Sequence, residues 1–107
     1  MLPKGVRRRY LALKITGEQS VSREDLLNTL WDSTIQLFGE YGASQTDLRL
    51  TRYDSEGNHA IIRCSHKTLE MTKAAVASIT EIDGRPVAIH IQRVSGTLKA
   101  LLKQRRT

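Results

Sequence analysis

The first clear pattern along the chain is an alternation of apolar and other residues at positions 9–15. Leu11, Leu13 and Ile15 fall on one side of this stretch. The other side carries Tyr10, Ala12 and Lys14. A period of two is typical of a strand that buries one face. We therefore predict a half-buried strand here.

A helical pattern follows. Ser22 is suited to cap the start of a helix, because its hydroxyl can accept a hydrogen bond from a free backbone N–H. Glu24 and Asp25 then place carboxylates in the first turn, where the helix dipole favours them. The expected core-facing stripe consists of Leu26, Leu27, Leu30, Trp31, Thr34, Ile35 and Phe38. We predict that Gly39 and Gly42 end this helix.

The rest of the chain alternates between strand-like and helix-like patterns. Residues 48–53 and 59–64 are predicted to form a hairpin, because a turn-rich segment separates two alternating stretches. A second helix is expected after Ser65. A turn should lead into a last strand at 87–94. Leucines at helical spacing from Leu98 onward predict a short terminal helix.

The order strand, helix, strand, strand, helix, strand is the split βαβ pattern. We predict an α+β, ferredoxin-like fold: an antiparallel four-stranded sheet with two packing helices and an extra basic C-terminal helix. The length of 107 residues fits a single domain, residues 1–107. Residues 1–8 would form a basic N-terminal arm, and residues 98–107 a basic helix and tail. In this fold the first and last strands are antiparallel neighbours.

The sheet would have one face covered by the two helices and one open face. The expected open face carries Tyr10, Ala12, Lys14, Thr51, Ile61, Arg63, His90, Gln92 and Val94. Either the terminal helix or a partner protein could cover it, and the pattern does not decide between them. Only Tyr10 and Tyr53 could offer aromatic rings on this side, so base stacking of the kind used by RNA recognition motifs is not expected.

Charge is concentrated at the two ends. The net charge is +6, yet residues 1–14 and residues 93–107 each hold five basic residues and no acidic one. Neighbouring first and last strands would bring both segments to one rim, where phosphates are the obvious partner. The predicted RNA-binding residues are Lys4, Arg7, Arg8, Arg9, Lys14, Arg93, Lys99, Lys103, Arg105 and Arg106.

The sequence offers little for catalysis or metal binding. Cys64 is the single cysteine, and its spacing from His59 and His66 matches no usual zinc site. No phosphate loop or dinucleotide fingerprint is present. We expect no catalytic residues, no metal and no cofactor bound by the protein. A lone cysteine indicates a reducing compartment, and no apolar run is long enough to cross a membrane, so a cytoplasmic location is expected.

Four segments in the expected order resemble a known family. They are Arg9-Tyr10-Leu11, Phe38-Gly39-Glu40-Tyr41-Gly42, Leu48-Arg49-Leu50, and Arg93-Val94-Ser95-Gly96-Thr97-Leu98-Lys99. Together they resemble ribonuclease P protein component 2, the archaeal relative of a subunit shared by eukaryotic ribonucleases P and MRP. The residues that match the family pattern are Arg9, Tyr10, Gly42, Arg93, Ser95, Gly96, Thr97 and Lys99.

The resemblance implies a protein subunit of ribonuclease P that supports the catalytic RNA in removing the 5′ leader from precursor tRNA. It implies that cleavage belongs to the RNA and its magnesium ions. The implied partners are ribonuclease P RNA, precursor tRNA indirectly, protein component 3 and the other ribonuclease P proteins, with no membrane. A homodimer formed through that partner complex stays open.

Two alternatives remain beside this expectation. The first is an enzyme of the acylphosphatase kind, which shares the fold, but its glycine-rich loop is not matched at residues 16–20. The second is a ferredoxin-like protein-interaction or regulatory module without RNA function, in which the basic ends serve only solubility.

Overall fold

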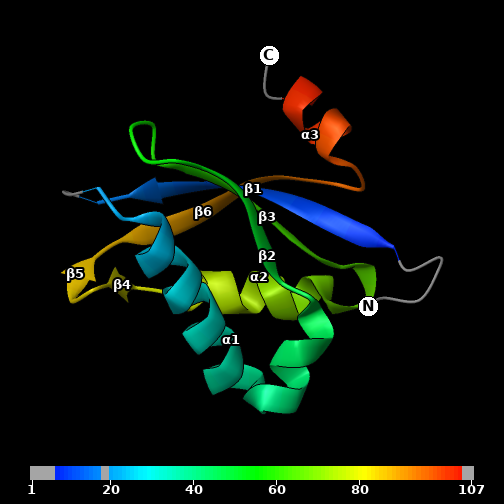
Figure 1. Ribbon diagram of the computed structural model, residues 1–107, viewed down its shortest axis with the longest axis horizontal. Helices are drawn as coiled ribbons and strands as arrows, with labels where there is room; N and C mark the ends of the chain where they lie inside the picture. The colour runs from blue at the N-terminus through cyan, green and yellow to red at the C-terminus, as the bar shows by residue number, and fades with distance from the viewer. Residues whose placement is uncertain (1–6, 18–19, 105–107) are drawn as a thin grey trace.

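The computed structural model describes residues 7–17 and 20–104 (Figure 1). The elements in chain order are β1 (Arg8–Thr16), α1 (Arg23–Thr46), β2 (Arg49–Asp54), β3 (His59–Ser65), a 3₁₀ turn (His66–Thr68), α2 (Leu69–Ala77), β4 (Glu81–Ile82), β5 (Arg85–Pro86), β6 (Ala88–Ser95) and α3 (Leu98–Gln104). In the part of the chain that the structure describes, no helix is long and apolar enough to span a membrane.

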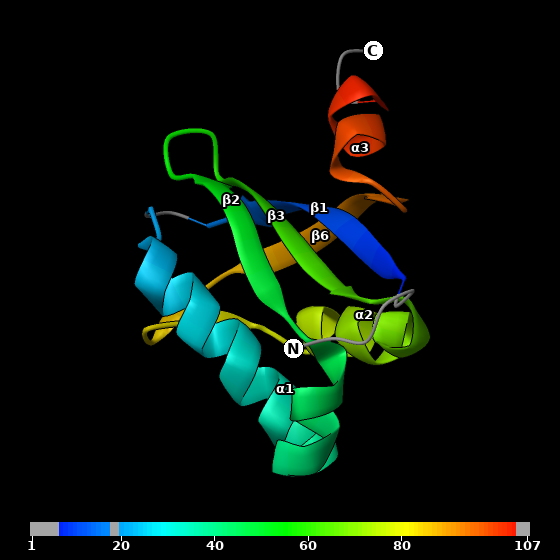
Figure 2. The same cartoon turned by 45° about the vertical axis from the view of Figure 1, so that its right-hand side comes forward.

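Four strands form one antiparallel sheet in the order β2-β3-β1-β6. This is the ferredoxin-like order, and it confirms the predicted fold class and the pairing of the first and last long strands. Helices α1 and α2 lie on one side of the sheet, and α3 lies on the other (Figures 1 and 2). The short β4–β5 hairpin was predicted only as a turn, because two-residue strands leave no alternation to detect.

The main core lies between the sheet and helices α1 and α2. Leu11, Leu13 and Ile15 are at most 2% exposed, as the alternation in β1 predicts, and they pack with Leu26 and Leu30 of α1. The N-cap is confirmed: the Ser22 hydroxyl accepts a hydrogen bond from the backbone N–H of Asp25 at 3.1 Å.

The predicted end of α1 is confirmed in part, because the helix breaks at Gly39 but does not stop at Gly42. Gly39 has φ 75° and ψ 172°, which kinks the helix, but helical turns continue to Thr46. They continue because this segment still packs inward, with Ala43 and Thr46 almost fully buried. Asp47, in the left-handed conformation, ends the helix instead of a glycine. Ile35, which was expected in the buried stripe, is 38% exposed.

Two β-bulges overturn part of the predicted open face. One lies between Leu50 and Arg52, and a second shifts the β1–β6 register between Ala12 and Leu13. Each bulge adds one residue to a strand and so exchanges the faces of the residues beyond it.

Tyr53 and Val94 therefore face the main core and not the open side. Tyr53 pairs with Ala60, packs against the core and donates a hydrogen bond from its hydroxyl to the carbonyl of Val21. Val94 pairs with Leu11 and packs against the same core. Their places on the open face are taken by two arginines, Arg52 opposite Ile61 and Arg93 opposite Ala12.

Helix α3 covers the centre of the open face, which answers the question that the sequence left open. Leu101 is 1% exposed and forms a small second core with Ala12 and Ile61. Around it, Tyr10, Leu98 and Leu102 are partly buried. The leucine spacing that predicts α3 thus also predicts the side by which it docks.

Candidate nucleic-acid interface

All four strands of the main sheet place basic side chains on its open face. Residues directly opposite each other in paired strands share a face. The register pairs Arg63 with both Tyr10 and Arg49, and it pairs Ile61 with both Ala12 and Arg52. By this register and the alternation of β1, the basic residues on the open face are Arg8, Lys14, Arg49, Arg52, Arg63 and Arg93.

The start of β1 and the end of β6, which belong to the two basic segments, lie side by side as predicted. Tyr10 pairs with Ser95, so the start of β1 lies beside the end of β6, and α3 begins three residues further on. A Cβ added at Gly96 would lie 3.3 Å from Nη1 of Arg9, which places the Arg9 side chain against this junction. Helix α3, which carries the exposed Lys99 and Lys103, lies on the open side of the sheet (Figure 2), and the alternation of β1 puts Arg8 on that side too.

The other predicted residues differ in their surroundings. Lys14 lies on the open face but towards the other end of β1, where its Nζ donates to the carbonyl of Gly57 at 3.1 Å. Arg9 donates to the carbonyl of Arg8, and Arg7 is exposed next to the start of β1. The predicted residues Lys4, Arg105 and Arg106 lie outside the described residues.

Three arginines surround one carboxylate at the end of the open face (the Asp47 cluster: Arg8, Arg49, Arg63 and Asp47). The Asp47 Oδ2 atom lies 3.5 Å from Nη2 of Arg63 and 3.8 Å from Nε of Arg8. Its Oδ1 atom lies 3.8 Å from Nε of Arg49. Asp47 reaches these residues because it is the left-handed cap between α1 and β2. The cluster keeps a charge of +2.

Sequence reasoning missed Arg49, Arg52 and Asp47 as parts of the interface, and it placed Arg63 on the open face without assigning it a role. The prediction relied on the net charge of each segment. Because the middle of the chain is acidic in sum, its individual arginines were left out. The signal that could have found Arg49 is the alternation Leu48-Arg49-Leu50. If the two leucines face the core, Arg49 must face the open side, as Tyr10 does in β1. Nothing in the sequence signals that Asp47 would turn towards the arginines.

Cys64 lies in the core and offers no reactive thiolate. It is fully buried, and this burial raises the pKa of its thiol more than the nearby charge of Arg9 lowers it. The neutral thiol therefore acts as a small apolar side chain. Among residues 7–17 and 20–104, no three His, Cys, Asp or Glu side chains gather where they could hold a metal ion.

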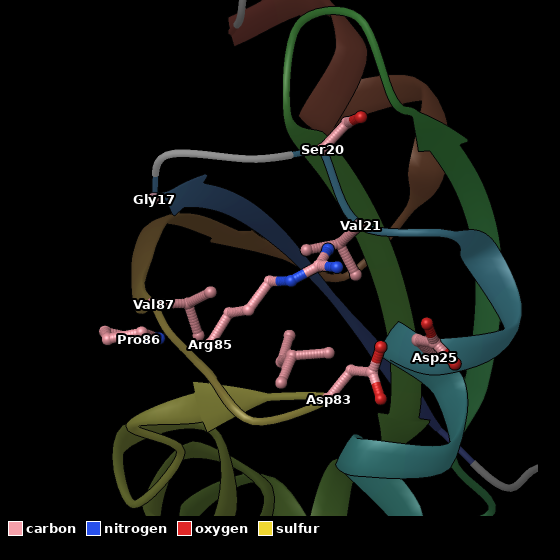
Figure 3. Close-up of a pocket in the computed structure, with 9 residues that line it drawn as sticks. Gly17, Ser20, Val21, Asp25, Asp83, Arg85, Pro86 and Val87 are labelled. Atoms are coloured by element: carbon pink, nitrogen blue, oxygen red, sulfur yellow. The ribbon is translucent and has the colours of Figure 1, made fainter.

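A pocket of about 290 Å³ lies at the far end of the sheet from the Asp47 cluster (Figure 3). Gly17, just beyond β1, lines it, whereas Arg8 begins the same strand. Its charged side chains are Asp25, Asp83 and Arg85. Two carboxylates beside one guanidinium do not favour a phosphate, so this pocket is not part of the candidate interface.

The fold defines a ferredoxin-like α+β protein, and comparison with known proteins agrees with this fold. Residues 9–105 match the model of the Rpp14/Pop5 family. The chain belongs to this family.

Named relatives and a solved structure support that assignment. Ribonuclease P protein component 2 of Methanosarcina mazei is 34% identical over 93 residues, which cover 87% of this chain and 78% of that protein. The protein of the same name from Methanobrevibacter smithii is 32% identical, over 96% of this chain and 93% of that protein. A chain in the cryo-EM structure of yeast ribonuclease MRP has the same fold, with a TM-score of 0.73 at 14% identity over 98% of this chain and 95% of that one.

Proposed function

We propose that this chain is a protein subunit of ribonuclease P, which binds and supports the catalytic RNA that removes the 5′ leader from precursor tRNA. Membership of the Rpp14/Pop5 family, together with relatives named ribonuclease P protein component 2, supports the role of ribonuclease P subunit. The observation that carries RNA binding is the gathering of basic residues from β1, β2, β3, β6 and α3 on one side of the sheet.

The open face favours contacts with phosphates over base stacking. Tyr53 faces the core, and Tyr10 is partly buried beneath the leucines of α3. An RNA recognition motif instead exposes aromatic rings on its sheet and stacks bases on them. Arginine and lysine side chains bind phosphate oxygens and release counterions, which gives affinity without reading the sequence.

We assign the cleavage chemistry and its magnesium ions to the RNA. We place the complex in the cytoplasm.

Protein component 3 is the proposed protein partner, and exposed apolar side chains on the helical side of the sheet support a protein contact there. These are Ile35, Leu37 and Tyr41, with Tyr41 80% exposed. Helix α1, which carries them, lies on the opposite side of the sheet from α3 (Figure 2). A protein and an RNA could therefore bind at the same time.

Reconstitution tests the function directly. Precursor tRNA processing is measured with ribonuclease P RNA and its other proteins, with and without this chain, at limiting magnesium. We expect the complete mixture to process faster and the chain alone to be inactive. Equal rates with and without the chain would contradict the proposal. Processing that depends on the chain but survives charge reversal at Arg7, Arg8 and Arg9, without change in RNA affinity, would favour the pure protein-interaction module.

A further inference from the structure

The Asp47 cluster has more positive charge than its single carboxylate can satisfy. Arg8, Arg49 and Arg63 all contact Asp47 at 3.5–3.8 Å, which is the range of loose ion pairs. Within the part of the chain that the structure describes, Asp47 Oδ2 and the Nε atoms of Arg8 and Arg63 have no hydrogen-bond partner. The carboxylate thus holds three guanidinium groups close together and leaves donors on them unused.

The exposure of the four side chains shows from which side another anion could reach them. The side chains of Asp47 and Arg63 are 17% and 20% exposed, so they form the base of the cluster. The side chain of Arg49 is 67% exposed, and that of Arg8 is 37% exposed. Both contact Asp47 through Nε, which leaves their terminal nitrogens for a second anion. A guanidinium fork matches the oxygens of a phosphate group.

We propose that the Asp47 cluster is the seat of one RNA phosphate, with Arg49 and Arg8 binding it, Arg63 supporting it from below, and Asp47 positioning all three arginines. This deepens the proposed function and rests on it, because the ligand is a phosphodiester of the bound RNA. One phosphate reduces the cluster from +2 to +1. The seat is built by β1, β2 and β3 and the end of α1, so it does not depend on the terminal segments.

Three variants test the seat by RNA affinity, measured with the full chain and ribonuclease P RNA over a range of salt concentrations. Arg49→Gln and Arg63→Gln each remove one charge from the cluster. Arg85→Gln is the matched control, because it removes the same charge at the far end of the sheet. We expect each cluster variant to bind about tenfold more weakly, with a shallower salt dependence. Arg85→Gln should bind like the wild type.

The outcomes separate this inference from the proposed function. If the wild type binds RNA with a steep salt dependence and Arg49→Gln matches Arg85→Gln, the seat is wrong and the function stands. If the wild type does not bind RNA in the presence of its partner proteins, the function itself fails. Weaker binding of a protein subunit by Arg49→Gln, with RNA affinity unchanged, would assign the cluster to a protein contact and overturn the seat.

Asp47→Asn gives a second test that needs no RNA. Asparagine tolerates the left-handed backbone of Asp47, so the helix end is kept while the charge is lost. The three arginines then repel one another, and the unfolding midpoint should fall in chloride buffer. Inorganic phosphate should raise that midpoint more for Asp47→Asn than for the wild type or for Arg63→Gln. Equal increments in all three proteins would overturn the seat.

Discussion

Leu101 of α3 and Ala12 of β1 pack together at the centre of the open face. The contact fixes a seven-residue helix that is too short to be stable alone. It also brings the lysines of α3 to the same side of the sheet as the arginines of β2 and β3. The position of the basic helix therefore depends on one small apolar cluster.

Leu101→Ala should weaken this attachment. Removing a fully buried leucine costs about 2–5 kcal/mol, and the lower end applies here because α3 lies at the edge of the molecule. Denaturant unfolding measures the loss, and RNA affinity should fall with it. Leu37→Ala is the control, because Leu37 is 48% exposed and its truncation should change stability by less than about 0.5 kcal/mol. Equal stabilities for the two variants would contradict the docking of α3.

The lysines of α3 should contribute to RNA affinity through charge alone. Lys99 and Lys103 are exposed, four residues apart on α3. Lys99→Gln combined with Lys103→Gln should leave the unfolding midpoint unchanged. It should lower RNA affinity about tenfold or more and reduce the slope of affinity against salt by about one to two. Unchanged affinity would mean that α3 serves only to cover the sheet.

Gly39 is predicted to be hard to replace for a backbone reason. Its φ of 75° and ψ of 172° belong to a region that side chains with a Cβ avoid, although no atom would lie within 4 Å of an added Cβ. Gly39→Ala should therefore cost about 1–3 kcal/mol through backbone strain. Asn28→Ala, at an exposed position of the same helix, should be neutral or slightly stabilising. Thermal unfolding of both variants distinguishes strain from a general effect on α1.

Cys64 should make the fold sensitive to alkaline pH. Burial raises the pKa of its thiol above that of the unfolded chain. The folded state thus binds the proton more tightly, and its stability falls as pH rises above about 8.5, where the unfolded thiol ionises. Between about pH 8 and 9.5 the wild type should lose more stability than Cys64→Ala, as measured by denaturant unfolding. Parallel curves for the two proteins would contradict a buried neutral thiol.

The elements that depend on local pattern were predictable from the sequence. The alternation in β1, the Ser22 cap and the β2–β3 hairpin all depend on neighbouring residues, and the structure confirms them. Strand order followed from the βαββαβ succession. Gly39 was read as a stop because glycine commonly ends helices, but burial of Ala43 and Thr46 beyond it favours further helical turns.

The parts that depend on distant contacts were not predictable. A bulge leaves no clear mark on the hydrophobic pattern, so the faces of Tyr53 and Val94 were assigned wrongly. The Asp47 cluster joins residues from three strands and a helix end. Arg8, Asp47 and Arg63 are far apart in the sequence, so their spacing does not indicate that three arginines would meet one carboxylate.

The salt dependence of affinity for ribonuclease P RNA tests most directly whether the open face binds RNA through phosphates. If about five side chains meet phosphates, a fourfold rise in salt should weaken binding by roughly two orders of magnitude. Binding that hardly changes over this range would contradict the account.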